Sequence, residues 1–144
     1  MTAAVDITFR TFLAVFALVG LGDSLIFAFN ALNHKETEIA CKDGTCIRLS
    51  KTPHAAVFFH IPNWIFGIAY YLLTILAALT TNPLLVGMSL LGVLISCGLS
   101  VYLIHSLIFK LKAMCKLCYL AHAMNFALLW MGRIPVVISL SLLI

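Results

Sequence analysis

The chain has 144 residues, of which 63% are hydrophobic and only 10% are charged. Soluble domains carry about 25% charged residues, so this composition excludes a disordered chain and an ordinary soluble enzyme. Nine Lys and Arg residues against five Asp and Glu give a net charge of +4, which is too small and too scattered for a nucleic-acid-binding patch. No Asp, Glu, Lys or Arg lies between Thr52 and Phe109. That stretch is long enough for two membrane spans, since one span needs about 20 apolar residues.

Four apolar segments follow one another along the chain. We predict four membrane-spanning helices, because a chain inside lipid must satisfy its own backbone hydrogen bonds. Their approximate bounds are residues 11–33, 62–81, 84–109 and 114–131. The links between the last three are short, which places consecutive helices antiparallel. The prediction is an all-α integral membrane protein, a single domain over residues 1–144 built as a four-transmembrane-helix bundle.

Two further segments complete this organisation. Residues 34–61 are the one sizeable polar segment, and the apolar half that starts at Thr52 predicts a short interfacial helix with Pro53 in its first turn. We expect this segment to cover one end of the bundle as a lid. Residues 134–144 are apolar but too short to span, so they either pack along the bundle or begin a fifth span. The first span is too long for a cleaved signal peptide, and no clear small-residue cleavage site follows it.

Four of the five cysteines form two close pairs. Cys41 and Cys46 lie in the polar segment, and Cys115 and Cys118 lie at the start of the fourth expected span. Spans two and three bring the chain back to the side of the membrane from which the polar segment leaves span one. Four thiols are therefore expected near one membrane face, and this is the central observation of the sequence.

The spacing of Cys115 and Cys118 points to disulfide exchange. Residues at i and i+3 lie on one side of a helix, so the two sulfurs are within bridging reach. Unpaired backbone N–H groups at the helix start, together with nearby Lys116, favour a thiolate there. A reactive thiolate beside a resolving thiol is what disulfide exchange requires. Cys41 and Cys46 flank an Asp-Gly turn signal, so a bridge between them would be exposed and exchangeable.

Other interpretations of the cysteines remain open. Two close pairs also suit zinc, although zinc pairs usually belong to polar, loop-rich domains and one pair here starts a membrane helix. A Cys41–Cys46 bridge with a purely structural role is the second alternative. Cys97 lies in the middle of the third expected span, where a cysteine behaves as a small core residue, and we assign it no redox role.

Polar residues inside apolar spans are candidates for function. Asn63 opens the second span, and His122 lies one helical turn after Cys118 on the same face. The structural alternatives are that Asn63 caps its helix and that His122 makes a helix-to-helix hydrogen bond.

Asp23 is the one acid within a span, and it either pairs with Ser24 or His105 or lines a wet cavity. Three tyrosines are expected to pack or to sit at the membrane interface first, and to form pocket walls second. They are Tyr70, Tyr71 and Tyr119.

Several motifs follow one another in a specific order between about Gly20 and Trp130. They are the loop pair Cys41 and Cys46, Ile61–Tyr71 (IPNWIFGIAYY), Ser100–Leu103 (SVYL), and Cys115-x-x-Cys118 followed by Asn125 and Trp130. This order resembles the vitamin K epoxide reductase family. The short chain, without a fused thioredoxin-like domain, looks like a prokaryotic stand-alone member.

The resemblance implies a four-helix bundle that holds a quinone near the Cys-x-x-Cys, with a role for each of four thiols. Cys118 matches the thiol that meets the quinone, and Cys115 matches its bridge partner. Cys46 matches the loop thiol that exchanges with Cys115. Cys41 matches the thiol that meets an outside thiol partner.

The resemblance also implies residues that bind the quinone. Asn63 matches the family asparagine that hydrogen-bonds one quinone carbonyl. His122 falls where vertebrate members have a tyrosine that bonds the other carbonyl, and histidine is also a donor. The characteristic loop serine corresponds to Thr52, which keeps the hydroxyl, while Ser50 matches less well. No metal ligand is expected.

The expected function is that of a membrane thiol oxidase that supports disulfide formation. Electrons would pass from the dithiol of a thioredoxin-fold partner, through the loop pair and the Cys-x-x-Cys pair, to a bound quinone of the ubiquinone, menaquinone or vitamin K type from the membrane pool. One alternative is the use of the same bundle as a vitamin K reductase, for the reduction of vitamin K quinone or its epoxide. Another is a non-enzymatic membrane protein whose cysteines bind metal or form structural disulfides that hold the lid in place.

The expected location is the plasma membrane, with several spans and an orientation on which two arguments disagree. Seven basic residues lie on the cysteine side, and only Arg10 and Arg133 lie on the other. The seven are Lys35, Lys42, Arg48, Lys51, Lys110, Lys112 and Lys116. The positive-inside rule makes the cysteine face cytoplasmic, whereas most members of the resembled family face away from the cytoplasm. Cytosolic disulfides are rare outside hyperthermophiles, so the charge count favours an inverted enzyme in such a cell.

Overall fold

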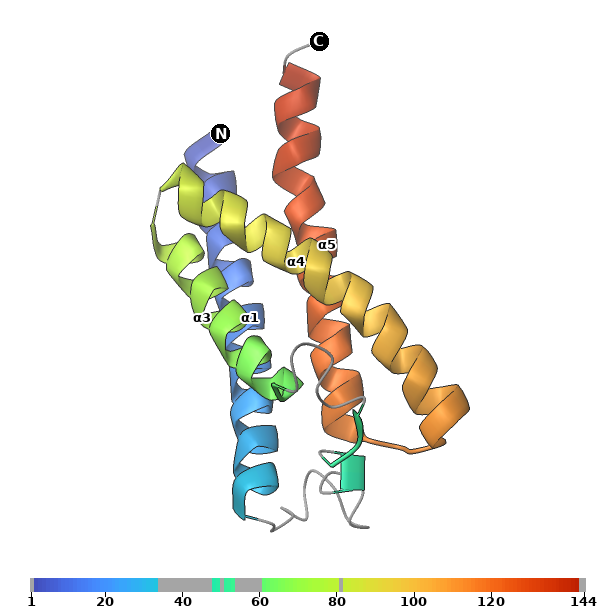
Figure 1. The fold of residues 1–144 in the computed structure, drawn as a ribbon. Coiled ribbons are helices and arrows are strands. Elements are labelled where there is room, and N and C mark those ends of the chain that lie inside the picture. Colours follow the sequence, from blue (N-terminus) through green and yellow to red (C-terminus); the bar gives the residue numbers. More distant parts are fainter. Residues whose placement is uncertain (1, 34–47, 50, 54–60, 81, 143–144) are drawn as a thin grey trace.

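Four helices make up most of the described chain in the computed structural model. The structure describes residues 2–33, 48–49, 51–53, 61–80 and 82–142, with the side chains of those between 7 and 131. The helices are α1 (Thr2–Asn33), α3 (Asn63–Leu79), α4 (Pro83–His105), which continues as the π-helical segment η2 (Ser106–Leu111), and α5 (Lys116–Leu142). No β-strand occurs among these described residues. The all-helical class is therefore confirmed (Figure 1).

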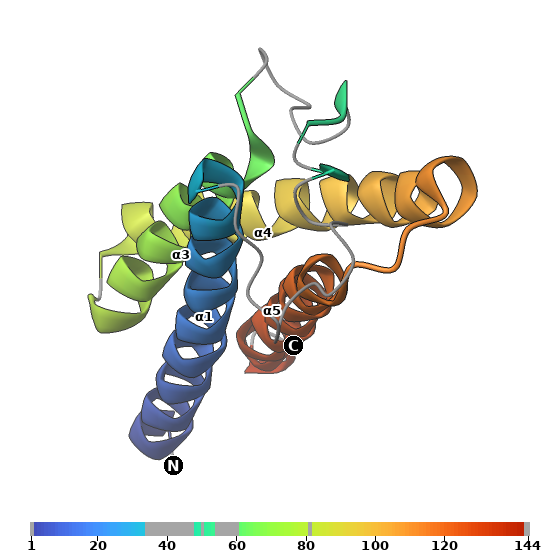
Figure 2. The same cartoon turned by 90° about the horizontal axis from the view of Figure 1, so that it is seen from below.

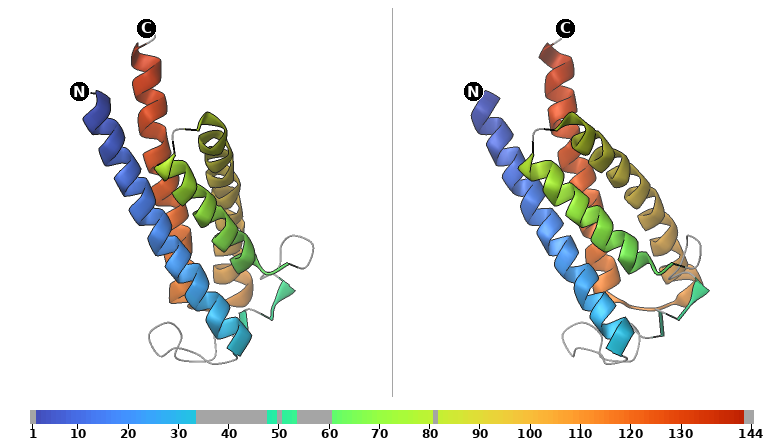
Figure 3. Two further views of the ribbon diagram at one scale, coloured as in Figure 1. Left: turned by 90° about the vertical axis from the view of Figure 1, so that its left-hand side faces the viewer. Right: turned by 60° about the vertical axis from the view of Figure 1, so that its left-hand side comes forward.

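The two chain termini lie at one end of the molecule, and the α4–α5 connection lies at the other (Figures 1 and 3). Helix α1 packs along α3, and α5 contacts both α1 and α4. Seen from below, α4 runs across the directions of α1 and α5 (Figure 2). At the terminal end, Arg10 Nη2 donates a 2.6 Å hydrogen bond to the Thr80 carbonyl. Arg10 therefore lies at the α3–α4 turn, away from the Cys-x-x-Cys.

Two of the helices are long and apolar enough to cross a membrane. They are residues Ile7–Asn33, with a mean hydropathy of 2.2, and Pro83–Leu111, with a mean hydropathy of 2.3. Only 28% and 22% of their most apolar windows are buried inside the chain. An apolar surface of this extent marks a membrane or protein contact. Helix α3 has 17 residues, so the prediction of four spans is supported for two helices and stays a prediction for the others.

Small residues let α1 and α3 approach closely. A Cβ placed on Gly20 would collide with the ring of Tyr71, and one on Gly67 would lie 2.8 Å from Ser24 Oγ. Small residues at a helix contact are typical of membrane proteins, where close backbone approach replaces hydrophobic association. In this contact the ring of Tyr71 on α3 lies against Gly20 of α1, and Ser24 of α1 lies against Gly67 of α3.

The chain turns sharply between α4 and α5. Lys112 adopts a left-handed conformation with φ 47° and ψ 42°, and the Ala113 N–H donates to the Leu107 carbonyl at 3.2 Å. This turn brings Cys115 back beside the end of α4. The turn therefore fixes where the second cysteine pair begins.

Helix α5 is longer than the fourth expected span. The span was expected to end near residue 131, with a separate apolar tail at residues 134–144, but α5 continues to Leu142. The helix passes through Pro135, and proline is tolerated inside membrane helices where neighbouring groups satisfy the backbone carbonyl that it leaves without a partner. The tail, as far as the structure describes it, extends α5 and begins no further helix.

Most of the expected lid lies outside the described residues. These include residues 34–47 and 54–60 and therefore Cys41, Cys46 and nearly all of the expected interfacial helix. The described part is residues 48–49, 51–53 and 61, in which Leu49 is buried. The lid as a whole stays a prediction.

Candidate functional site

Cys115 and Cys118 stand at the start of α5 with their sulfurs at disulfide-bonding distance. Cys115 is the last residue before the helix, and the two Cα atoms are 5.2 Å apart. The backbone N–H of Cys118 donates to Cys115 Sγ at 3.2 Å. This N–H belongs to the first helical turn, whose amides have no partner within the helix. The prediction that the two sulfurs lie close enough to form a disulfide is confirmed. The amide of Cys118, one of those left without a partner at the helix start, donates to the sulfur of Cys115.

The two cysteines face different surroundings. Cys115 has no exposed surface and packs in a cluster with four other buried residues. These are Leu49, Leu107, Ala113 and Leu117. Cys118 is only partly buried and lines a cavity between the helices. The sulfur of Cys115 therefore lies in a buried cluster that includes Leu49 of the lid segment, whereas Cys118 forms part of the cavity wall.

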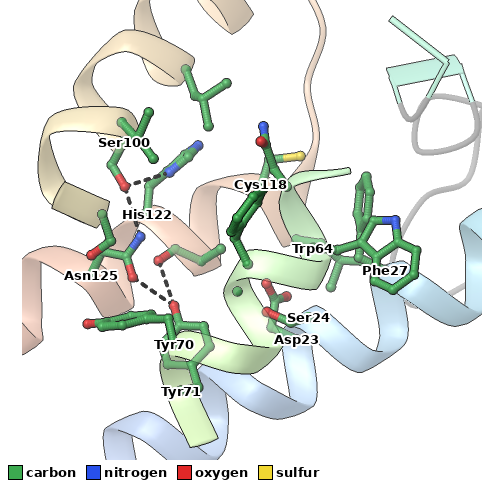
Figure 4. Close-up of a pocket in the computed structure, with 18 of the residues that line it drawn as sticks. Asp23, Ser24, Phe27, Trp64, Tyr70, Tyr71, Ser100, Cys118, His122 and Asn125 are labelled. Carbon is green, nitrogen blue, oxygen red and sulfur yellow. Dashed lines mark hydrogen bonds between the residues drawn. The ribbon is translucent and has the colours of Figure 1, made fainter. Parts of the chain in front are cut away.

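The cavity has a volume of about 660 Å³ and is lined by residues of α1, α3, α4 and α5 (Figure 4). Most of the wall is apolar, and a few polar side chains interrupt it. Its polar and tyrosine residues are Asp23, Ser24, Thr52, Asn63, Tyr70, Tyr71, Ser96, Ser100, Ser106, His122 and Asn125. A mostly apolar cavity of this size with a few polar groups is typical of sites for small molecules and cofactors.

The three residues predicted to bind a cofactor all line this cavity together with Cys118. They are Asn63 at the start of α3, His122 on α5 and Thr52 in the lid segment. Pro62 occupies the N-cap position of α3, and no side chain makes a capping bond there. The capping alternative for Asn63 is therefore wrong. The Thr52 hydroxyl donates to the Leu49 carbonyl at 2.8 Å, which folds the lid segment on itself.

His122 makes the helix-to-helix hydrogen bond of the structural alternative, and it also lines the cavity, as a residue that binds a cofactor would. Its Nδ1 lies 3.0 Å from Ser100 Oγ on α4, so the helix-to-helix hydrogen bond is confirmed. The ring is 8% exposed and also lines the cavity. One ring nitrogen is used between the helices, and the ring stands on the same wall as Cys118.

Ser100 belongs to a polar network that the sequence did not predict. Asn125 Nδ2 donates to Ser100 Oγ at 2.9 Å, and Tyr71 Oη donates to Asn125 Oδ1 at 2.8 Å. Tyr71 was expected to pack first and to form a pocket wall second, and Asn125 was quoted only as part of a motif. A signal was present, because serine and asparagine inside apolar helices are costly without partners.

Asp23 on α1 lines the cavity. The sequence had left two alternatives for this residue, a pairing with Ser24 or His105 and a place on a cavity wall, and the second is the one observed. The residue is 5% exposed, and its Oδ1 is buried without a hydrogen-bond partner. Among the described residues it makes no hydrogen bond or ion pair with Ser24 or His105, and the His105 ring stacks near Phe109 instead. Ser106 Oγ, also on the wall, is likewise buried without a partner. Buried polar atoms are normally hydrogen-bonded, so these two oxygens are suited to meet polar groups of a ligand or water.

Cys97 behaves as the small core residue that was expected. It is a buried free thiol on α4, and its Sγ donates to the Asn125 carbonyl at 3.2 Å. No group of three or more His, Cys, Asp or Glu residues able to hold a metal occurs in the described part of the chain. The zinc alternative involves Cys41 and Cys46, which lie outside it.

Comparison with known proteins agrees with this site. A search of curated protein sequences finds no match to the chain. A model of the vitamin K epoxide reductase family matches residues 11–132, which include the whole cavity wall and both Cys115 and Cys118. The chain therefore belongs to the vitamin K epoxide reductase family.

Proposed function

We propose that this chain is a membrane thiol oxidase that transfers two electrons from the dithiol of a thioredoxin-fold protein to a quinone. Family membership makes it a membrane oxidoreductase with quinone and thiol chemistry. The direction of electron flow, the partner and the order of the thiols are our proposal. The observation that carries it is the division of one redox pair between two environments, with Cys118 on the cavity wall and Cys115 beneath Leu49.

The residues of the cavity suit a quinone. A quinone is a flat apolar ring with two carbonyl acceptors, and the cavity offers apolar walls of matching character with few polar side chains. Asn63 and His122 would hold the carbonyls, since both residue types carry N–H donors. A bound quinone of the ubiquinone, menaquinone or vitamin K type supplies the two-electron acceptor.

The thiols of the chain carry the electrons to the cavity in steps that balance. The partner's dithiol reduces the Cys41–Cys46 disulfide and becomes a disulfide itself. The Cys46 thiolate then attacks Cys115 Sγ, which breaks the Cys115–Cys118 bond and leaves Cys118 as a thiolate on the cavity wall. Cys41 attacks Cys46, restores the loop disulfide and releases Cys115. Each step exchanges one S–S bond for another, and the reduced Cys115–Cys118 pair holds the two electrons for the quinone.

The N-terminal amides of α5 support this exchange. The Cys118 N–H already donates to Cys115 Sγ at 3.2 Å. When Cys115 is released as a thiolate, this bond becomes charge-assisted and therefore stronger. The positive end of the helix acts in the same direction. The helix start thus stabilises the leaving sulfur.

We further propose that the four helices span the plasma membrane with the cysteine end in the cytoplasm. The described basic residues support this orientation. Five of them lie in the lid segment or around the α4–α5 connection: Arg48, Lys51, Lys110, Lys112 and Lys116. Arg10 lies at the opposite end, bonded to Thr80. Cytoplasmic ends of membrane proteins carry the excess of Lys and Arg.

A quinone-reduction assay tests the function. The purified protein in lipid nanodiscs receives a reduced thioredoxin-fold protein and a water-soluble quinone, and the decrease of quinone absorbance is followed. We expect dithiol-dependent reduction that Cys118→Ala and Cys115→Ala abolish and Cys97→Ala leaves intact. Full activity in either of the first two variants would contradict the proposal. Reduction of vitamin K epoxide at the expense of an added small dithiol, with no oxidation of the protein partner, would favour the vitamin K reductase alternative, and stoichiometric zinc in the purified protein would favour the metal alternative.

A further inference from the structure

Four polar side chains form one continuous hydrogen-bonded row beside the cavity. Tyr71 of α3 bonds Asn125 of α5 at 2.8 Å, Asn125 bonds Ser100 of α4 at 2.9 Å, and Ser100 bonds His122 of α5 at 3.0 Å (Figure 4). The row thus connects three helices. All four residues line the cavity, and Tyr71, Ser100 and His122 are buried.

The first bond fixes the orientation of the Asn125 amide. The Tyr71 hydroxyl has a single hydrogen and two acceptors in reach, Asn125 Oδ1 at 2.8 Å and the Ala121 carbonyl at 3.4 Å. If the amide were turned over, its NH₂ would face Tyr71, and the tyrosine hydrogen would have only the longer contact. The shorter bond therefore holds the amide oxygen toward Tyr71 and the NH₂ toward Ser100.

The orientation of Asn125 then fixes the direction of the Ser100 hydroxyl. Ser100 Oγ accepts a hydrogen from Asn125 Nδ2, so its own hydrogen is available to donate. The other partner of Ser100 Oγ in the described residues is His122 Nδ1. An N–H at Nδ1 would place two hydrogens against each other and leave the serine hydrogen without an acceptor. His122 Nδ1 is therefore the acceptor in this bond.

We infer that Tyr71, Asn125 and Ser100 act as positioning residues that hold the His122 imidazole with its hydrogen on Nε2. A ring in this form presents a donor at the one nitrogen that the row does not use. The opposite tautomer would present a lone pair, which repels a carbonyl oxygen. Because the ring lines the cavity with Cys118, the row makes His122 a permanent donor for a carbonyl ligand. The identity of that ligand as a quinone rests on the proposed function.

The tautomer is measured directly by ¹⁵N NMR of protein that carries ¹⁵N-labelled histidine, without any quinone. The chain has five histidines, and the signals of His122 are those missing from His122→Gln. We expect a protonated Nε2 and an unprotonated Nδ1 in the unmodified protein. Ser100→Ala removes the hydroxyl and should turn the signals into those of a tautomer mixture, and Ser100→Thr should restore them. A ring protonated at Nδ1, or signals unchanged in Ser100→Ala, would overturn the inference.

Ser96→Ala is the matched control for this measurement. Ser96 lines the same cavity one turn earlier on α4, and its hydroxyl donates to the Val93 carbonyl at 3.0 Å and not to His122. The His122 signals should therefore be the same in Ser96→Ala and in the unmodified protein. An equal change in Ser96→Ala and Ser100→Ala would show a general disturbance of α4 and overturn the specific role of Ser100.

Quinone binding separates this inference from the proposed function. Titration of a water-soluble quinone against tryptophan fluorescence should give about twofold weaker binding in Ser100→Ala, because an even tautomer mixture halves the fraction of rings that present the donor. Ser100→Thr should bind as tightly as the unmodified protein. The expected tautomer without any quinone binding would support the row and contradict the function. Quinone binding to a ring protonated at Nδ1 would support the function and overturn the row.

Discussion

Leu49 and Cys115 belong to one cluster of buried residues, although one lies in the lid segment and the other at the start of α5. Leu49 is 6% exposed and Cys115 has no exposed surface. Attack on a disulfide requires a thiolate to approach the sulfur in line. In this arrangement Leu49 occupies part of the space around Cys115. Because no surface of Cys115 is exposed, the exchange with Cys46 that we propose requires residues of this cluster to move.

The first prediction follows from this contact. Leu49→Ala should let a water-soluble reductant reduce the Cys115–Cys118 bridge several times faster, because the side chain that covers Cys115 is shortened. The variant should also lose about 2 kcal/mol of stability, the lower end for truncation of a buried leucine. Reduction is followed by thiol labelling and peptide mass mapping. Leu79→Ala is the control, since Leu79 is 72% exposed at the end of α3. Equal reduction rates in the two variants would show that Leu49 does not shield Cys115.

The second prediction is a trapped exchange intermediate. A variant without Cys41 and Cys118 retains Cys46 and Cys115 with no competing resolving thiol. When a mild chemical oxidant is added to accept the two electrons, a Cys46–Cys115 disulfide should form and be detected by peptide mass mapping. The matching variant, without Cys46 and Cys118, should form a Cys41–Cys115 bridge more slowly. Faster formation in that second variant would reverse the roles of the two loop thiols.

The third prediction concerns the two proposed carbonyl donors. Asn63→Ala and His122→Ala should each weaken quinone use more than they lower stability, because each removes one hydrogen bond to a buried carbonyl. Such a loss costs about 1–3 kcal/mol, or about 5- to 150-fold in affinity. The measurements are the KM for quinone and the midpoint of thermal unfolding. If neither variant changes the KM, both residues have only structural roles.

The fourth prediction is the orientation in the membrane. The C-terminal end of α5 lies at the end of the molecule opposite the Cys-x-x-Cys (Figure 1). A reporter fused there should be active outside the cytoplasm if the cysteine end is cytoplasmic, as the distribution of Lys and Arg predicts. The fusion is expressed in the native host or a close surrogate. A reporter found in the cytoplasm would reverse the orientation and restore the family norm.

Much of the site was predictable because its information is local. An i, i+3 spacing fixes both sulfurs on one side of any helix, whatever the helix packs against. The same reasoning put His122 on the face of Cys118, and both residues line the cavity. Asn63, placed by family resemblance, also lines it.

The sequence by itself determined the helical class and the apolar segments, because hydropathy and backbone hydrogen bonding act within a segment. Only the tertiary structure decided which helix faces meet. The helices are apolar on nearly all sides, so their patterns do not specify a rotation. The bond between Ser100 and His122 and the burial of Cys115 under Leu49 therefore became visible only in the packed molecule. Both depend on how separate helices and the lid segment pack, which no local spacing encodes.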